Sequence, residues 1–226
     1  MSMQYCLMEL FGDRGAQELI DRRGSDNMHY DVIIVGAGSM GMAAGYFLAQ
    51  SGKRTLLVDS FNPPHDKGSH HGDTRIIRYA YGEGEEYVPL ALKAKELWDE
   101  LEKQTGKEIF LQTGVLNIGV AESDFIKSVI SSAKKFTLPV RVMNSAEMNH
   151  AWPGMSLPPN LIGCFESTSG VLKCGECIDA YKELAELHGA TIVTNSRVKD
   201  MEIHEGSVTI KSDDQTYTGN SLVVSA

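Results

Sequence analysis

Residues 32–59 read VIIVGAGSMGMAAGYFLAQSGKRTLLVD, and this stretch decides the fold. An apolar β-branched run, Val32–Val35, leads into a GxGxxG turn and a helix of small residues, and a second apolar run, Thr55–Val58, ends at Asp59. A strand before the turn, a helix after it and an acid at the end of the second strand are the context that the motif requires. The sequence therefore predicts a dinucleotide-binding βαβ unit.

Three glycines define the geometry of the turn. Gly36 permits the tight turn off the first strand, Gly38 lets a pyrophosphate approach the backbone, and Gly41 lets the helix pack closely on the strand. The pyrophosphate of FAD or NAD would lie at the helix N-terminus, where free N–H groups and the helix dipole favour negative charge. We expect the cofactor to be bound by Gly36, Ala37, Gly38, Ser39, Met40 and Gly41.

Asp59 stands near the roughly 20-residue offset at which an acid meets the ribose hydroxyls of such a cofactor. Its charge disfavours a 2′-phosphate, so NADP is the dinucleotide least expected here. A glycine-rich turn without a ligand is the alternative interpretation, and it leaves the placement of the acid to chance.

Length and composition narrow the class of protein. The 226 residues suffice for one large domain or two small ones, with 42% hydrophobic and 23% charged residues. The formal net charge of −9, without a basic stripe, argues against nucleic acid as a partner. No apolar run approaches the roughly 20 residues that span a bilayer, and no signal-peptide pattern opens the chain. We therefore expect a cytoplasmic protein that is not bound to a membrane.

Four cysteines, Cys6, Cys164, Cys174 and Cys177, are too few for a disulfide framework in a chain of this size. The CxxC spacing of the last two invites a zinc or redox interpretation. Zinc needs about four ligands, however, and no second CxxC or histidine pair lies nearby. We expect no metal, and predict that these two residues open a helix with one or both thiols packed as small hydrophobes.

The rest of the chain predicts an α/β fold with two parts. A Rossmann-like FAD-binding domain, with a parallel sheet plus a β-meander, would comprise residues 29–109 and 172–226, and residues 110–171 would form part of a second, α+β substrate domain. Residues 1–28 differ in character and are predicted to be an extension outside the fold. Helices are expected over 87–104, 122–136, 146–151 and 177–188, and strands over 115–118, 140–143, 162–166, 191–194, 198–204, 207–212 and 222–225. Because the chain ends in an apolar strand, we expect it to be a fragment.

A loop rich in Pro, Gly and His, FNPPHDKGSHHGDTRIIR at residues 61–78, follows the βαβ unit and carries an unusual density of polar side chains. Arg75 and Arg78 would share a face on a helical turn, whereas an extended strand would send them to opposite faces. A guanidinium binds carboxylates in bidentate fashion, and a cation beside a flavin stabilises its reduced anion. The alternative is a solvated basic loop that pairs with Glu83, Glu85 and Glu86.

From Tyr30 to Trp98 the chain resembles the family of monomeric sarcosine oxidase and N-methyltryptophan oxidase. The resemblance rests on VGAGSMGMAAGYFLA (35–49), LLVDSFNPPH (56–65) and GSHHGDTRIIR (68–78), and continues in TGVL (113–116), AWPG (151–154) and SGVL (169–172). The loop sequence is far more specific than the glycine motif.

The resemblance implies a flavoprotein that oxidises the N-methyl group of an amino acid, sarcosine above all, to give glycine, formaldehyde and hydrogen peroxide with oxygen as acceptor. It implies that FAD contacts the glycine turn, Asp59 and Val198, that Arg75 lies against the flavin beside Thr74 and His71, and that Arg78 binds the substrate carboxylate. Family members continue well beyond the length of this chain, and the further part supplies the cysteine that bonds to the flavin; we expect the full-length protein to be a monomer. An N-methyltryptophan oxidase, an NAD-dependent dehydrogenase, or a non-catalytic remnant that binds at most FAD are the alternatives.

Overall fold

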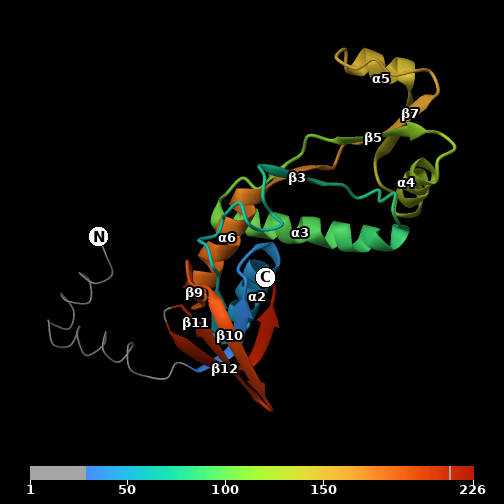
Figure 1. The fold of residues 1–226 in the computed structure, drawn as a ribbon. Helices are drawn as coiled ribbons and strands as arrows, with labels where there is room; N and C mark the ends of the chain where they lie inside the picture. The colour runs from blue at the N-terminus through green and yellow to red at the C-terminus, as the bar shows by residue number, and fades with distance from the viewer. Residues whose placement is uncertain (1–28, 214) are drawn as a thin grey trace.

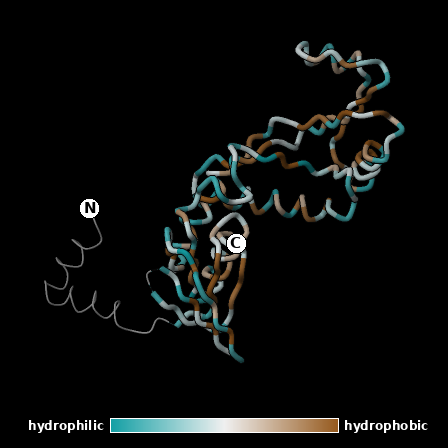
Figure 2. Tube along the Cα trace, in the orientation of Figure 1, coloured by the Kyte–Doolittle hydropathy of each residue, from teal (hydrophilic) through white to brown (hydrophobic). Residues whose placement is uncertain are grey.

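The structure is a computed structural model that describes residues 29–213 and 215–226, so the predicted extension 1–28 lies outside the described residues. One end of the molecule is built on a six-stranded sheet, and the other carries α4, α5, β5 and β7 (Figure 1). Hydrophobic stretches of the trace gather at both ends (Figure 2), in keeping with separate groups of buried apolar side chains. The described part of the chain contains no helix that is both long and apolar enough to cross a bilayer.

The six-stranded sheet has the order β10-β11-β12-β1-β2-β9. Its strands are β1 (His29–Val35), β2 (Thr55–Val58), β9 (Thr191–Val193), β10 (Val198–His204), β11 (Ser207–Ser212) and β12 (Thr216–Val224). Strands β12, β1, β2 and β9 are parallel, while β10, β11 and β12 form an antiparallel meander. The predicted combination of a parallel sheet and a meander is confirmed.

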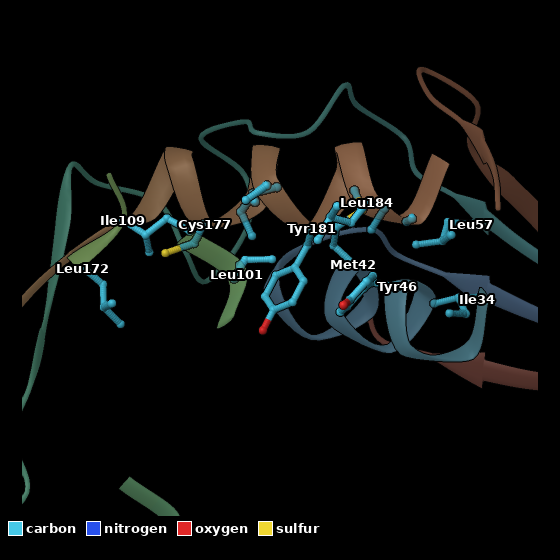
Figure 3. Close-up of a cluster of buried hydrophobic side chains, with 14 of the residues drawn as sticks. Ile34, Met42, Tyr46, Leu57, Leu101, Ile109, Leu172, Cys177, Tyr181 and Leu184 are labelled. Atoms are coloured by element: carbon cyan, nitrogen blue, oxygen red, sulfur yellow. The ribbon is translucent and has the colours of Figure 1, made fainter. Parts of the chain in front are cut away.

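Three helices pack together beside this sheet: α2 (Ser39–Gln50), α3 (Val88–Thr105) and α6 (Cys174–Leu187). Their contact is a cluster of buried side chains (Figure 3) in which Tyr181 lies 5.5 Å, between ring centroids, from both Tyr46 and Trp98. Leu57 and Ile34 extend the cluster into the sheet. The small residues of α2 bring it close to β2, because a Cβ at Gly45 would lie 2.6 Å from a methyl group of Leu57.

A second sheet, of order β5-β7-β6, is antiparallel and comprises β5 (Val115–Val120), β6 (Val140–Asn144) and β7 (Leu161–Glu166). Helix α4 (Asp124–Lys135) covers it with the buried side chains of Ile126 and Val129. Helix α5 (Ser145–Ala151) begins at a capping box between Asn144 and Glu147. Capping by a side chain satisfies N–H groups that a helix start leaves free.

A third, short sheet of order β3-β8-β4 connects the two larger ones. It consists of β3 (Thr74–Ile77), β4 (Phe110–Leu111) and β8 (Gly170–Lys173), and the 3-10 helix η1 (Glu85–Tyr87) precedes α3. None of these four elements was predicted. Each has four residues or fewer, which is too short for a periodic pattern of apolar residues to reveal it.

Some elements begin earlier than predicted. Helix α6 begins at Cys174 rather than at position 177, and β12 begins at Thr216 rather than at position 222. The residues of β12 before position 222 are mostly polar, so the hydropathy pattern did not indicate a strand there. They are nevertheless part of the strand, because their backbone pairs with β1 on one side and with β11 on the other. The pairing, and not the hydropathy pattern, sets its length.

Candidate functional site

The turn between β1 and α2 has the backbone geometry that the glycine motif requires. Gly36 adopts a φ of +96°, which favours glycine. A Cβ at Gly41 would lie 1.8 Å from the Gly36 carbonyl oxygen and 3.3 Å from a methyl group of Ile34. The helix start is therefore held against the turn at a distance that only glycine permits.

Asp59 connects the turn to the next strand. Its Oδ2 accepts a 2.6 Å hydrogen bond from the Ala37 N–H, and its Oδ1 accepts one of 2.8 Å from the Phe61 N–H. His65 Nε2 lies 3.3 Å from Oδ1, within ion-pair distance. These contacts hold the carboxylate at the carboxyl ends of β1 and β2, where ligands of parallel sheets bind.

A cavity of about 350 Å³ opens beside this carboxylate. It is lined by residues of the turn, of the ends of β1 and β2, and of the loop after β2. Ser196, just before β10, and Val198, the first residue of β10, complete the lining. The predicted cofactor residues among them are Gly36, Gly38, Ser39, Met40, Asp59 and Val198. The first-turn N–H groups of a helix have no intrahelical partners. Helix α2 has no acid in its first turn and no side-chain cap within the described residues, so its N-terminus suits an anion.

Two buried polar side chains in this region have unsatisfied hydrogen-bonding groups. His70 is 8% exposed and Ser196 is fully buried, and within residues 29–213 and 215–226 neither His70 ring nitrogen nor the Ser196 hydroxyl has a partner. Burial is the main cause that lowers the pKa of His70, so the neutral imidazole is favoured. Because buried polar groups are nearly always hydrogen-bonded, the unsatisfied groups fit a bound polar ligand such as a dinucleotide.

The loop after β2 brings His70 over the turn. A Cβ at Gly38 would lie 3.7 Å from the His70 Nδ1, and the Ser39 and Ser69 hydroxyls are 3.4 Å apart. The rings of His65 and His70 are 5.5 Å apart between centroids. The loop thus covers one side of the turn.

Arg75 lies in β3, and its guanidinium donates hydrogen bonds to three carbonyl oxygens, at 2.9 Å to Thr74, 3.1 Å to Ser69 and 2.5 Å to His71. No carboxylate of the described chain forms an ion pair with it. Its charge is therefore held in place and left uncompensated, which suits an anionic group nearby. Thr74 and His71, whose carbonyl oxygens accept two of these hydrogen bonds, are exposed residues.

Arg78 follows β3 directly and faces a different environment. It forms an ion pair with Glu83, and its guanidinium lies 5.1 Å from the ring centroid of Tyr81 and 6.0 Å from that of Phe125. The structure therefore selects the extended alternative for this segment, and it does not bring the two arginines together. The alternative interpretation, a basic loop paired with nearby glutamates, is met at one point, because Arg78 pairs with Glu83.

A smaller cavity, of about 180 Å³, lies between α2, α3 and α6. It is lined by Ser39, Ser69, His70, Arg75, Trp98, Leu172, Cys174, Cys177, Ile178 and Tyr181. Both cysteines are free and buried, and burial raises the pKa of Cys177 to about 12. They pack as small apolar side chains, as predicted, and the raised pKa of Cys177 leaves its thiol unactivated.

Sequence reasoning missed His65, His70 and Ser196 as functional candidates. It singled out the second histidine of the pair, His71, whose side chain is exposed, whereas the first is buried against the turn. Since neighbouring side chains of an extended segment point to opposite sides, the sequence could have indicated that one of the two histidines is buried, but not which one. Ser196 lies more than a hundred residues from the turn, and only the pairing of β9 beside β2 brings it there.

This combination of a parallel sheet, a glycine turn at a helix N-terminus and an acid at the next strand end is typical of the class of dinucleotide-binding proteins. The family model for FAD dependent oxidoreductases matches residues 31–226, and the chain belongs to this family. A flavin cofactor follows from that membership.

Curated relatives confirm the resemblance. The chain is 55% identical over 198 residues to monomeric sarcosine oxidase from Bacillus sp. (strain B-0618), covering 87% of this chain and 51% of the relative. It is 43% identical over 199 residues to N-methyl-L-tryptophan oxidase from Yersinia pestis (strain Pestoides F), covering 88% and 54%. The chain thus spans about half the length of the curated relatives it matches.

Solved structures support the fold. NikD, described as an unusual amino acid oxidase essential for nikkomycin biosynthesis, superposes in its open form with a TM-score of 0.80 at 22% identity, over 88% of this chain and 51% of NikD. L-proline dehydrogenase from P. horikoshii gives a TM-score of 0.76 at 20% identity, over 89% and 54%. At such identities the likeness shows the fold alone.

Proposed function

We propose that this chain is the FAD-binding part of an oxidase of N-methyl amino acids, with sarcosine as the preferred substrate. The reaction would convert sarcosine, oxygen and water into glycine, formaldehyde and hydrogen peroxide. FAD, when bound, supplies the electron acceptor for oxidation of the N-methyl group to an imine and passes the electrons on to oxygen. Water then hydrolyses the imine.

The residues of this chain would bind and orient the reactants. The turn from Gly36 to Gly41 would hold the pyrophosphate, and Asp59 the adenosine ribose. Arg75, with Thr74 and His71 beside it, would stabilise negative charge on the reduced flavin. Arg78 would bind the substrate carboxylate, once its pair with Glu83 is exchanged for the substrate.

The observation that carries the cofactor proposal is the bond from Ala37 to Asp59, which places an acid beside the free N–H groups of α2 at the mouth of the 350 Å³ cavity. The proposal of a substrate rests on the relatives named for sarcosine and N-methyl-L-tryptophan, of which the first is the more similar. A soluble monomer in the cytoplasm fits this proposal.

A non-catalytic chain that binds FAD without turnover is the second candidate. It is favoured by the ion pair of Arg78 with Glu83, which occupies the guanidinium that would bind a substrate carboxylate. N-methyl-L-tryptophan is the alternative substrate.

The experiment that separates the candidates is a visible spectrum of the purified chain after acid precipitation, together with peroxide release on sarcosine and on N-methyl-L-tryptophan. Flavin in the supernatant with peroxide from sarcosine supports the full proposal. Flavin without peroxide from either substrate supports the second candidate, and colourless protein contradicts both.

A pair of arginine variants tests the proposed substrate contact. Arg78→Gln should weaken binding of the carboxylate, whereas Arg141→Gln, which removes another arginine paired with a glutamate, should leave it unchanged. Equal effects of both substitutions would contradict the assignment of Arg78.

A further inference from the structure

Glu166, the last residue of β7, has a fully buried carboxylate. Its Oε2 accepts hydrogen bonds from the Tyr79 N–H at 3.0 Å and the Ser169 hydroxyl at 2.6 Å, and the Ala80 N–H lies 3.2 Å from both oxygens. No lysine, arginine or histidine of the described chain pairs with it. A buried charge is tolerated when hydrogen bonds satisfy it, and N–H groups that meet a carboxylate form strong ones.

The two N–H groups belong to the residues directly after Arg78. A further contact from the second sheet's helix fixes the next residue, because the buried Ser132 hydroxyl donates a 2.9 Å hydrogen bond to the Tyr81 carbonyl. The segment 79–81 is therefore held from two elements, β7 and α4.

The side chain of Arg78 depends on this segment. Tyr81 places its ring 5.1 Å from the guanidinium carbon, and the adjoining Gly82 is buried against Phe125, whose ring would lie 2.4 Å from a Cβ at that position. The Arg78 Nε is buried and has no hydrogen-bond partner within the described residues. A shift of the backbone at residues 79 and 80 would move both the start of the arginine side chain and the ring that supports it.

We infer that Glu166 is a positioning residue, whose buried carboxylate fixes the backbone of Tyr79 and Ala80 and thereby aims the Arg78 guanidinium at the carboxylate of an amino-acid substrate. This inference rests on the proposed function of Arg78. It gives β7, a strand of the second sheet, a part in positioning the substrate-binding arginine.

Glu102 offers a matched control. Its Oε1 accepts hydrogen bonds from the N–H groups of two consecutive residues, Ile109 at 2.7 Å and Phe110 at 2.9 Å. Glu102→Gln weakens the same kind of contact near the end of α3, because a neutral amide oxygen replaces the carboxylate oxygen as acceptor.

The test uses acetate as the probe on the full chain labelled with ¹⁵N-arginine, and reads the Arg78 Nε–H signal during titration. Hydrogen exchange at the amides of residues 79 and 80 reports the contact with Glu166 directly. We expect Glu166→Gln to raise the Kd for acetate about tenfold and to speed exchange at both amides, while the affinity for FAD stays unchanged. Glu102→Gln should speed exchange at residues 109 and 110 only.

Ser169→Ala, which removes one hydrogen bond and no charge, is the milder variant if Glu166→Gln does not fold, and should raise the Kd for acetate about threefold. An unchanged Kd in a folded Glu166 or Ser169 variant would overturn the inference. Arg78→Gln separates this failure from failure of the proposed function. If acetate binds equally well without Arg78, the role of the arginine is wrong; if only the Glu166 and Ser169 variants have no effect, the positioning role alone is wrong.

Discussion

The Ala37 N–H donates a 2.6 Å hydrogen bond to Oδ2 of Asp59, which ties the glycine turn after β1 to the acid that ends β2. The same carboxylate accepts the Phe61 N–H and lies beside His65. One side chain thus orders the turn, the start of the following loop and the edge of the cavity.

Replacing this acid should weaken cofactor binding. Asp59→Ala removes hydrogen bonds to a charged group, each worth about 1.5–3 kcal/mol. We expect the Kd for FAD to rise about tenfold to a hundredfold in a flavin-fluorescence titration. Asp31→Asn is the control, because Asp31 accepts the Arg54 N–H at 2.8 Å at the opposite ends of the same two strands. An equal loss of FAD affinity in both variants would show that the loss comes from disturbed pairing of β1 and β2 and not from the carboxylate of Asp59.

A methyl group at Gly41 should destabilise the fold. The added carbon would lie 1.8 Å from the Gly36 carbonyl oxygen, so the turn must move. Overpacking of this kind costs about 1–3 kcal/mol, which urea unfolding would measure as a lower midpoint. Gly154→Ala adds a methyl group in open space and should change the free energy of unfolding by less than about 0.5 kcal/mol. A tolerated Gly41→Ala would contradict the close contact of helix and turn.

Stability should fall as the pH drops below about 6.5. Burial lowers the pKa of His70 in the folded chain, with a further contribution from the neighbouring His65. The unfolded chain then binds a proton more readily than the folded chain. The free energy of unfolding therefore becomes smaller as the pH falls below the pKa of the unfolded state. His70→Gln should flatten this slope between pH 7 and 5, whereas substitution of the exposed His150 by Gln should leave it unchanged. The opposite ranking would show that another group controls the slope.

Release of Arg78 from its ion pair should strengthen binding of small carboxylates. Glu83 is half exposed, and exposed pairs contribute about 0–1 kcal/mol. We therefore expect Glu83→Gln to lower the Kd for acetate about twofold to fivefold at low salt, with a smaller difference at high salt. Glu96→Gln breaks an exposed pair with Lys93 on α3 and should have no such effect. A weaker affinity in Glu83→Gln would mean that the pair orients the arginine.

Long periodic elements were accessible from the sequence. The strands of the βαβ unit, the helix of small residues and the hairpin of β10 and β11 follow from local patterns and turn residues, and the structure contains them all. The short strands β3, β4 and β8 were not accessible, because each of them owes its conformation to backbone bonds with a distant strand.

Local chemistry in the sequence determined the glycine turn, its acid and the family to which the chain belongs, since residue types at fixed spacing impose these features wherever the chain goes. The tertiary structure decided which histidine of the pair is buried, that the two arginines face different surroundings, and that Glu166 reaches the segment after Arg78. These contacts join residues far apart in the chain, and they depend on how strands pair and helices pack.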